Sequence, residues 1–125
     1  MKIVLVTLLF LFTTSITGCS MANAEPDIIS QQEAYELITS GADAVILDVR
    51  THAEFSEQHI PNSVLLPLDE IADLALELFD TNTTLLVICR SGNRSQEATK
   101  LLAELGFTHV YDIGGIITWP GIIIN

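Results

Sequence analysis

The chain has 125 residues, of which 49% are hydrophobic and 17% charged, and a formal net charge of −11. This length corresponds to one domain, and so large an apolar share excludes an intrinsically disordered chain. Two cysteines cannot make a disulfide framework or a four-ligand zinc site, and the histidine spacing suits no metal site. The acidic charge disfavours nucleic acid and anionic membrane surfaces as partners.

The first segment, residues 1–24, is predicted to be an export signal that is removed. Lys2 gives a short positive start, and residues 3–12 form an apolar run that is too short to cross a bilayer as a helix. Small and polar residues follow this run, as they do in signals for secretion. We therefore expect an exported, periplasmic protein.

Two positions compete for cleavage of this signal. Residues 16–19, ITGC, resemble a bacterial lipobox, in which Cys19 would be lipidated and become the mature N-terminus. Residues 22–24, ANA, instead predict cleavage before Glu25. Contact with a membrane is expected only through a lipid anchor on Cys19. From Glu25 onward, four Lys and Arg residues stand against 16 Asp and Glu residues, a net charge of −12.

The folded domain is expected over residues 25–125, with helices at five places. Ser-Gln-Gln-Glu at residues 30–33 and Thr-His-Ala-Glu at residues 51–54 are capping boxes, which open helices to about Thr39 and His59. Apolar side chains along one face predict two more helices, and a short one is expected near the C-terminus: residues 69–79, 95–105 and 116–119.

Between the helices, short apolar runs predict buried strands. These runs are residues 45–49, 63–66, 84–88 and 109–111, and the isoleucine tail at 122–124 is interpreted as a last edge strand. Residues 25–29 are expected to be a lead-in and residues 114–115 a turn. The alternation predicts an α/β fold with a central, mainly parallel five-stranded sheet and helices on both faces. Ligands then belong at the carboxyl ends of the strands.

Cys89 stands at such a place, after the strand at 84–88 and before the helix from Ser95. Successive backbone N–H groups of the turn between them can converge on one point, and the helix start adds partial positive charge. Gly92 permits a positive φ and Asn93 tolerates one. This arrangement favours a thiolate that acts as a nucleophile without a general base. The alternative is a buried core cysteine with no reactivity.

Basic residues gather around this thiol. Arg90, Arg94 and Lys100 are three of the four that follow Glu25, and they fall within eleven positions. An anion would therefore be repelled by the protein at a distance and attracted at the mouth of the site. Lys100 is expected to point outward, and the alternative for the cluster is a solvated helix start with incidental charges.

Three motifs resemble those of one family. Residues 89–95, CRSGNRS, resemble the active-site loop of single-domain rhodaneses, which are sulfurtransferases. Other segments resemble the upstream and C-terminal motifs of this family, so that the resemblance runs from about residue 28 to 121: residues 47–51, Glu54-Phe55, residues 59–61, Gly114-Gly115 and Trp119. Gln58 and Asn62 stand where the upstream motif has glycines, which puts the local turn geometry in doubt.

The resemblance implies transfer of a sulfane sulfur without a metal or organic cofactor. Cys89 would take the outer sulfur of thiosulfate or a similar small anionic donor, hold it as a persulfide and pass it to a thiol, cyanide or protein acceptor. Such a two-step covalent reaction gives ping-pong kinetics. The implied substrate-binding residues are those of the loop, in a protein expected to be a monomer: Arg90, Ser91, Gly92, Asn93, Arg94 and Ser95.

Two other functions stay open, a non-catalytic or sulfur-carrier binding module and a cysteine-based phosphatase or arsenate reductase. The latter enzymes use C-x5-R, whereas Arg94 stands at C-x4-R, which makes a tighter cradle that fits one sulfur better than phosphate. Asp48 and Arg50 are expected to brace the sheet end by an ion pair. Glu54 is expected in the same network and as a helix cap, and His59 as a structural residue.

Overall fold

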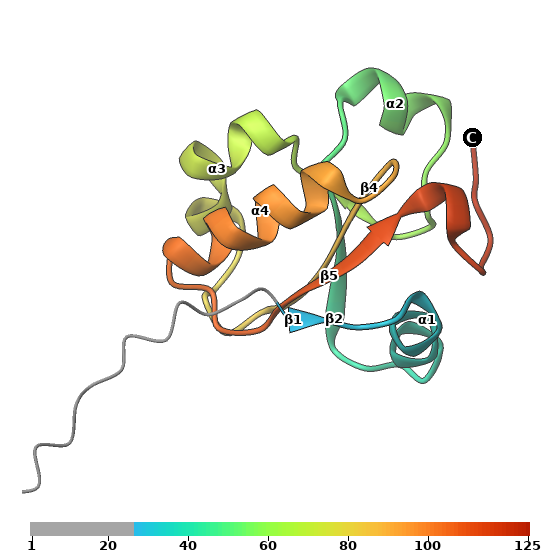
Figure 1. Ribbon diagram of the computed structural model, residues 1–125, viewed down its shortest axis with the longest axis horizontal. Helices are drawn as coiled ribbons and strands as arrows, with labels where there is room; N and C mark the ends of the chain where they lie inside the picture. The colour runs from blue at the N-terminus through green and yellow to red at the C-terminus, as the bar shows by residue number, and fades with distance from the viewer. Residues whose placement is uncertain (1–26) are drawn as a thin grey trace, which may run out of the picture.

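The computed structural model describes residues 27–125 (Figure 1). The predicted export signal, both predicted cleavage positions and the lipidation candidate Cys19 lie outside the described residues. Within the described part, no helix is long and apolar enough to cross a membrane.

Five strands form one sheet, in the order β1-β5-β4-β2-β3, and every pairing is parallel. The strands are β1 (Asp27–Ile28), β2 (Ala44–Asp48), β3 (Val64–Leu65), β4 (Thr84–Cys89) and β5 (Val110–Gly115). The apolar strand β4 lies in the centre, between β2 and β5, and is buried from its second residue to its last. All carboxyl ends therefore point to the same edge, and the predicted α/β fold is confirmed.

The sequence predictions for the outer parts of the sheet are wrong in three places. Residues 25–29 are no lead-in, because they contain β1, in which Asp27 lies opposite Tyr111 of β5. The isoleucine tail is not an edge strand of the sheet. Instead, Ile124 and His59 exchange two backbone hydrogen bonds of 2.8 Å in an isolated antiparallel bridge. The predicted turn at residues 114–115 belongs to β5, which continues to Gly115.

The helices form close to their predicted positions, and both capping boxes are present. The helices are α1 (Gln31–Thr39), α2 (His52–Glu57), α3 (Ile71–Leu78) and α4 (Asn93–Glu104), with short 3-10 turns η1 (Leu68–Glu70) and η2 (Ile116–Thr118). The side chains of Ser30 and Thr51 accept hydrogen bonds from the backbone N–H groups of Glu33 and Glu54. The side chains of these glutamates accept hydrogen bonds from the backbone N–H groups of Ser30 and Thr51 in return. Compared with the prediction, α2 ends two residues early and α4 begins two residues early.

At the two positions where the upstream motif of the family has glycine, this chain has Gln58 and Asn62, and the backbone conformation at both positions suits these residues. Asn62 has a φ of 63°, in the left-handed region that glycine favours and that asparagine tolerates better than most residues. Gln58 has a φ of −164°, which is extended backbone open to any residue. Neither departure therefore disturbs the turn.

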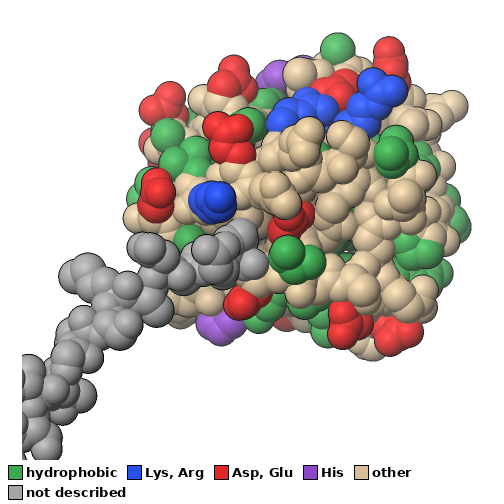
Figure 2. All heavy atoms as spheres, viewed as in Figure 1, with side chains coloured by type: hydrophobic (Ala, Val, Ile, Leu, Met, Phe, Trp, Pro, Cys, Tyr) green, Lys and Arg blue, Asp and Glu red, His purple; other side chains and the backbone are tan. Residues whose placement is uncertain are grey.

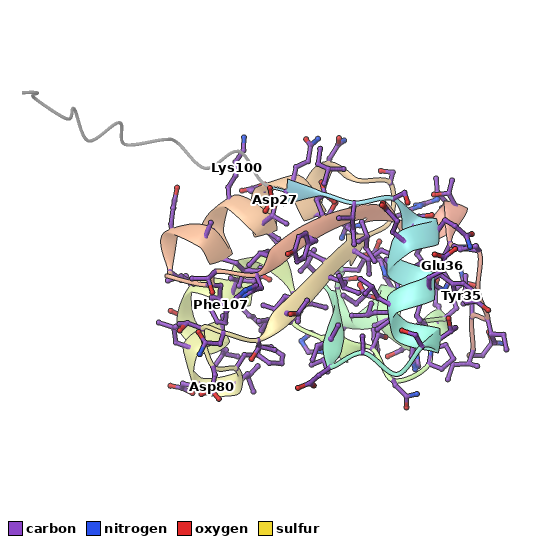
Figure 3. The ribbon with its side chains drawn as sticks, turned by 90° about the horizontal axis from the view of Figure 1, so that it is seen from below. Asp27, Tyr35, Glu36, Asp80, Lys100 and Phe107 are labelled. Carbon is purple, nitrogen blue, oxygen red and sulfur yellow. The ribbon has the colours of Figure 1, made fainter. Side chains whose placement is uncertain are left out.

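Helices cover both faces of the sheet, with α3 and α4 on one face and α1 on the other (Figure 1). Alternate residues of β4 point to opposite faces, as the pleat requires. Leu85 and Val87 join a core cluster with α3 and α4, whereas Leu86 and Ile88 join one with α1 and the C-terminal segment. On this second face, Tyr35 of α1 (labelled in Figure 3) packs edge-on against Trp119, with ring centroids 5.9 Å apart.

Candidate active site

The site lies at the carboxyl edge of the sheet, where three neighbouring strands end. Cys89 is the last residue of β4 and pairs with Gly115, the last residue of β5. On its other side, Asp48 ends β2 and lies opposite Ile88. Parallel pairing thus brings Cys89, Asp48 and Gly115 together, although they are far apart in the sequence.

The loop after Cys89 turns back over the thiol. Gly92 adopts a φ of 110°, a conformation that glycine takes without steric strain, and its N–H donates a 3.0 Å hydrogen bond to Sγ of Cys89. Ser95, fully buried in the first turn of α4, donates to the carbonyl oxygen of Gly92 at 2.9 Å. The turn is therefore fixed from both sides.

The surroundings of the sulfur differ from the sequence prediction in two ways. The sequence predicted several amides converging on the thiol, but among the described residues one hydrogen bond reaches Sγ, that of Gly92. Cys89 is also 1% exposed and contributes to the core cluster under α3 and α4. Arg90 and Ser91, which follow it directly, are exposed, so the chain reaches the surface immediately after Cys89.

Gly115 lets the loop rest directly on β5. A Cβ atom at this position would lie 2.2 Å from the carbonyl oxygen of Arg90 and 2.6 Å from Cα of Ser91, so no larger residue fits. The end of β5 is held in turn by Gln31, the first residue of α1. Its side-chain amide donates to the carbonyl oxygens of Ile113 at 2.9 Å and Gly115 at 2.7 Å. Sequence reasoning missed Gln31, since a glutamine at a helix start carries no signal of this contact.

Asp48 and Arg50 form the expected ion pair beneath the site. Both residues are buried, and the guanidinium donates to the carboxylate from Nε at 2.9 Å and from Nη2 at 2.7 Å. The backbone N–H of Arg50 donates to the same carboxylate at 3.0 Å. Nη2 also donates to the carbonyl oxygen of Gln58 at 2.8 Å, so this pair links the end of β2 to the end of α2.

Glu54 caps α2 as predicted, but its charge partner is Arg94. The two guanidinium nitrogens Nη1 and Nη2 donate to the two carboxylate oxygens at 2.7 and 2.8 Å. These hydrogen bonds lower the pKa of Glu54 to about 2. The hydrogen bonds with Glu54 likewise raise the pKa of Arg94. Glu54 therefore joins the Asp48–Arg50 network through its backbone carbonyl oxygen, which accepts from Nη1 of Arg50 at 3.5 Å, while its carboxylate binds Arg94.

The positive charges that the sequence places around the thiol are thus mostly paired or remote. Arg50 and Arg94 are in ion pairs, and Lys100 is exposed on α4 and points away from the body of the domain (Figure 3). Arg90 is exposed and makes no ion pair within residues 27–125. Among the described residues, the guanidinium of Arg90 is therefore the one that stands beside Cys89 without an ion pair.

A comparison with protein families shows to which family the chain belongs. The model of the rhodanese-like domain matches residues 30–119, which contain every strand except β1. The chain belongs to the rhodanese-like domain family. The resemblance found in the three sequence motifs is therefore confirmed.

Individual relatives support this placement. The thiosulfate sulfurtransferase GlpE of Pseudomonas syringae is 40% identical over 92 residues, which cover 73% of this chain and 84% of GlpE. The thiosulfate sulfurtransferase PspE of Escherichia coli is 34% identical over 71 residues, covering 56% of this chain and 68% of PspE. The crystal structure of a rhodanese-like domain protein from Staphylococcus aureus is 31% identical, with a TM-score of 0.68 and coverage of 74% of this chain and 90% of that one.

Proposed function

We propose that this protein is a sulfurtransferase that moves a sulfane sulfur from thiosulfate or a similar donor to a thiophilic acceptor through Cys89. Its homology to thiosulfate sulfurtransferases supports the reaction class. The observation that carries the role of Cys89 is the hydrogen bond from the Gly92 amide to Sγ, at the carboxyl end of the central strand. Cys89 is also the free cysteine of the described residues.

In the first step, the thiolate of Cys89 attacks the outer sulfur of the donor. A new S–S bond forms, the S–S bond of thiosulfate breaks, and sulfite leaves with the bonding electron pair. In the second step, cyanide or an acceptor thiolate attacks the outer sulfur of the Cys89 persulfide and releases the thiolate. The Gly92 amide donates to Sγ, which carries the negative charge of the thiolate before the first step and again after the second, and this preformed contact stabilises that charge without reorganisation.

The burial of Cys89 restricts which donors react. With 1% of the residue exposed, a donor has to place its transferable sulfur beneath the loop while the rest of the molecule stays outside. Sulfane donors meet this condition, because their outer sulfur projects from the molecule. The transition state of phosphate-ester hydrolysis, in contrast, needs a cradle around three oxygens, which the C-x4-R loop is too short to form.

The experiment compares the wild type with Cys89→Ser. We expect the wild type to form thiocyanate from thiosulfate and cyanide with ping-pong kinetics, and to gain the mass of one sulfur atom after thiosulfate alone. Cys89→Ser should show neither, with an unchanged far-UV circular dichroism spectrum as the control for folding. The same intact masses identify the mature N-terminus, at a lipidated Cys19 or at Glu25. Hydrolysis of p-nitrophenyl phosphate faster than thiocyanate formation would overturn the proposal.

A further inference from the structure

A small cavity of about 210 Å³ opens at the carboxyl edge of the sheet and is lined by Arg90, the residue that follows Cys89. One side is built by residues that lie one or two positions beyond three strand ends: Arg50 after β2, Arg90 after β4, and Ile116 and Ile117 after β5. The other side is built by α2, which contributes Glu54 and Glu57. Because Arg90 directly follows Cys89 at the end of β4, we take this cavity as the place where a donor approaches the thiol.

The cavity is less positive than its two arginines suggest. Arg50 is neutralised by Asp48, and Glu54 by Arg94. This leaves Arg90 and Glu57, both exposed and both without an ion pair in the part of the chain that the structure describes. Any donor in the cavity therefore meets one positive and one negative free charge.

The remaining wall of the cavity is apolar. Ile116 is buried, whereas Ile117 is 69% exposed at the rim. The N–H of Ile117 donates to the carbonyl oxygen of Arg90 at 3.4 Å, which holds this rim against the first residue of the loop. An organic group on the donor could cover Ile117 and remove apolar surface from water. The sulfite part of thiosulfate has no apolar surface and gains no free energy from this contact.

We propose that the cavity selects sulfane donors with a single negative charge and an apolar group, of the organic thiosulfonate class, over the thiosulfate dianion. This inference rests on the proposed function and makes Glu57 its specificity-determining residue. The Cys89 thiolate attacks the outer sulfur of R–SO2–S⁻, an S–S bond forms, the bond between the donor's two sulfurs breaks, and the sulfinate R–SO2⁻ leaves with the electron pair. Arg90 pairs with the one charge, and Glu57 disfavours a second.

The charge of Glu57 is tested by Glu57→Gln, with thiosulfate and benzenethiosulfonate as donors and cyanide as acceptor at low ionic strength. We expect kcat/KM for thiosulfate to rise about threefold relative to that for benzenethiosulfonate, as the removal of one exposed charge contact implies. Glu77→Gln is the matched control, since Glu77 is an exposed acid of α3 outside the cavity. An unchanged donor ratio in Glu57→Gln, or the same change in both variants, would overturn the proposal.

The apolar wall is tested by Ile117→Ser, with Ile122→Ser as its control, because Ile122 is similarly exposed at 74% and lies outside the cavity. We expect Ile117→Ser to lower kcat/KM for benzenethiosulfonate about threefold, as the loss of an aliphatic contact implies, and to leave thiosulfate unchanged. Equal losses for both donors, or an equal effect of Ile122→Ser, would contradict the role of this wall.

A third measurement does not depend on sulfur transfer. The alkylation rates of Cys89 by iodoacetate, an anion, and by iodoacetamide, which is neutral, are followed on the Cys89 peptide by mass spectrometry. We expect Glu57→Gln to raise the iodoacetate-to-iodoacetamide ratio about threefold. If no donor yields thiocyanate, the proposed function fails, whereas an unchanged alkylation ratio overturns the assignment of Glu57 to the mouth of the site.

Discussion

The carboxylate of Glu54 both caps α2 and binds Arg94 of α4. It accepts hydrogen bonds from the backbone N–H and the hydroxyl of Thr51 at 2.9 and 3.0 Å, which caps α2, and it binds Arg94, in the first turn of α4, through both oxygens. The side chains of Glu54 and Arg94 are 27% and 32% exposed, so solvent weakens the ion pair without abolishing it. Glu54 thereby connects the end of β2, through α2, to the loop that carries Cys89.

Glu54→Gln separates these two roles, because glutamine still completes a capping box but cannot form the ion pair. We expect a loss of about 1–2 kcal/mol in the free energy of unfolding at pH 7. The pKa of this carboxyl is about 2 in the folded protein against an ordinary 4.5, so its stabilisation is complete above pH 4.5 and is lost as the pH falls toward 2. Urea denaturation should therefore show the difference between variant and wild type roughly halved near pH 3.2.

Glu33 provides the matched control for this prediction. It occupies the same capping-box position in α1, where Ser30 lowers its pKa by hydrogen bonding, and no arginine binds it in the described chain. Glu33→Gln should destabilise less than Glu54→Gln. Equal losses in the two variants would assign the whole effect of Glu54 to capping rather than to Arg94.

Among the secondary-structure elements, β5 is the support on which the loop rests. Its last residue, Gly115, contacts the backbone of Arg90 and Ser91, and its carbonyl groups are bound by Gln31 at the start of α1. One side-chain amide therefore joins α1 to the strand end beside Cys89. The position of the loop depends on this junction as well as on its own sequence.

Gln31→Leu tests this junction, because leucine has a similar size and no donor. Two backbone carbonyl groups lose their partner, and we expect the free energy of unfolding to fall by about 1–2 kcal/mol and thiocyanate formation to decrease. Gln32→Leu is the control, since the amide of Gln32 reaches only Glu36 on the surface, at 3.0 Å. A Gln31→Leu variant that loses stability but keeps the full rate of thiocyanate formation would show that the loop is positioned without α1.

Sequence reasoning succeeded for the elements whose signals are local. The capping boxes predict α1 and α2, and the apolar run predicts the central strand β4, because a few neighbouring residues decide each of them. It failed for β1, since two exposed residues become a strand only by pairing with β5. Sequence reasoning also failed for contacts between residues that are far apart in the sequence. Glu54 and Arg94 are separated by 40 residues, and Gln31 and Gly115 by 84. The family and the Asp48–Arg50 ion pair could therefore be predicted from the sequence, whereas the contacts of Arg94 and Gln31 that hold the loop could not.

At the scale of the whole molecule, charge opposes the approach of small anions. The chain has 16 acidic and five basic residues. Figure 2 shows acidic side chains spread over the visible face, while some Lys and Arg side chains adjoin one another at its upper edge and others lie apart from them. Since Arg50 and Arg94 are paired, the long-range field is that of an acidic protein, in whose described part Arg90 is the one arginine without an ion pair.

This balance predicts an unusual salt dependence for a site with an arginine at its mouth. Salt screens the repulsion between the acidic surface and a dianion over distances beyond about 10 Å, whereas the contact with Arg90 acts at close range. We expect kcat/KM for thiosulfate to rise by about two- to fivefold between roughly 10 mM and 150 mM ionic strength. Alkylation of Cys89 by neutral iodoacetamide is the control and should stay constant. A kcat/KM that falls with salt would mean that Arg90 attracts the dianion more strongly than the rest of the molecule repels it.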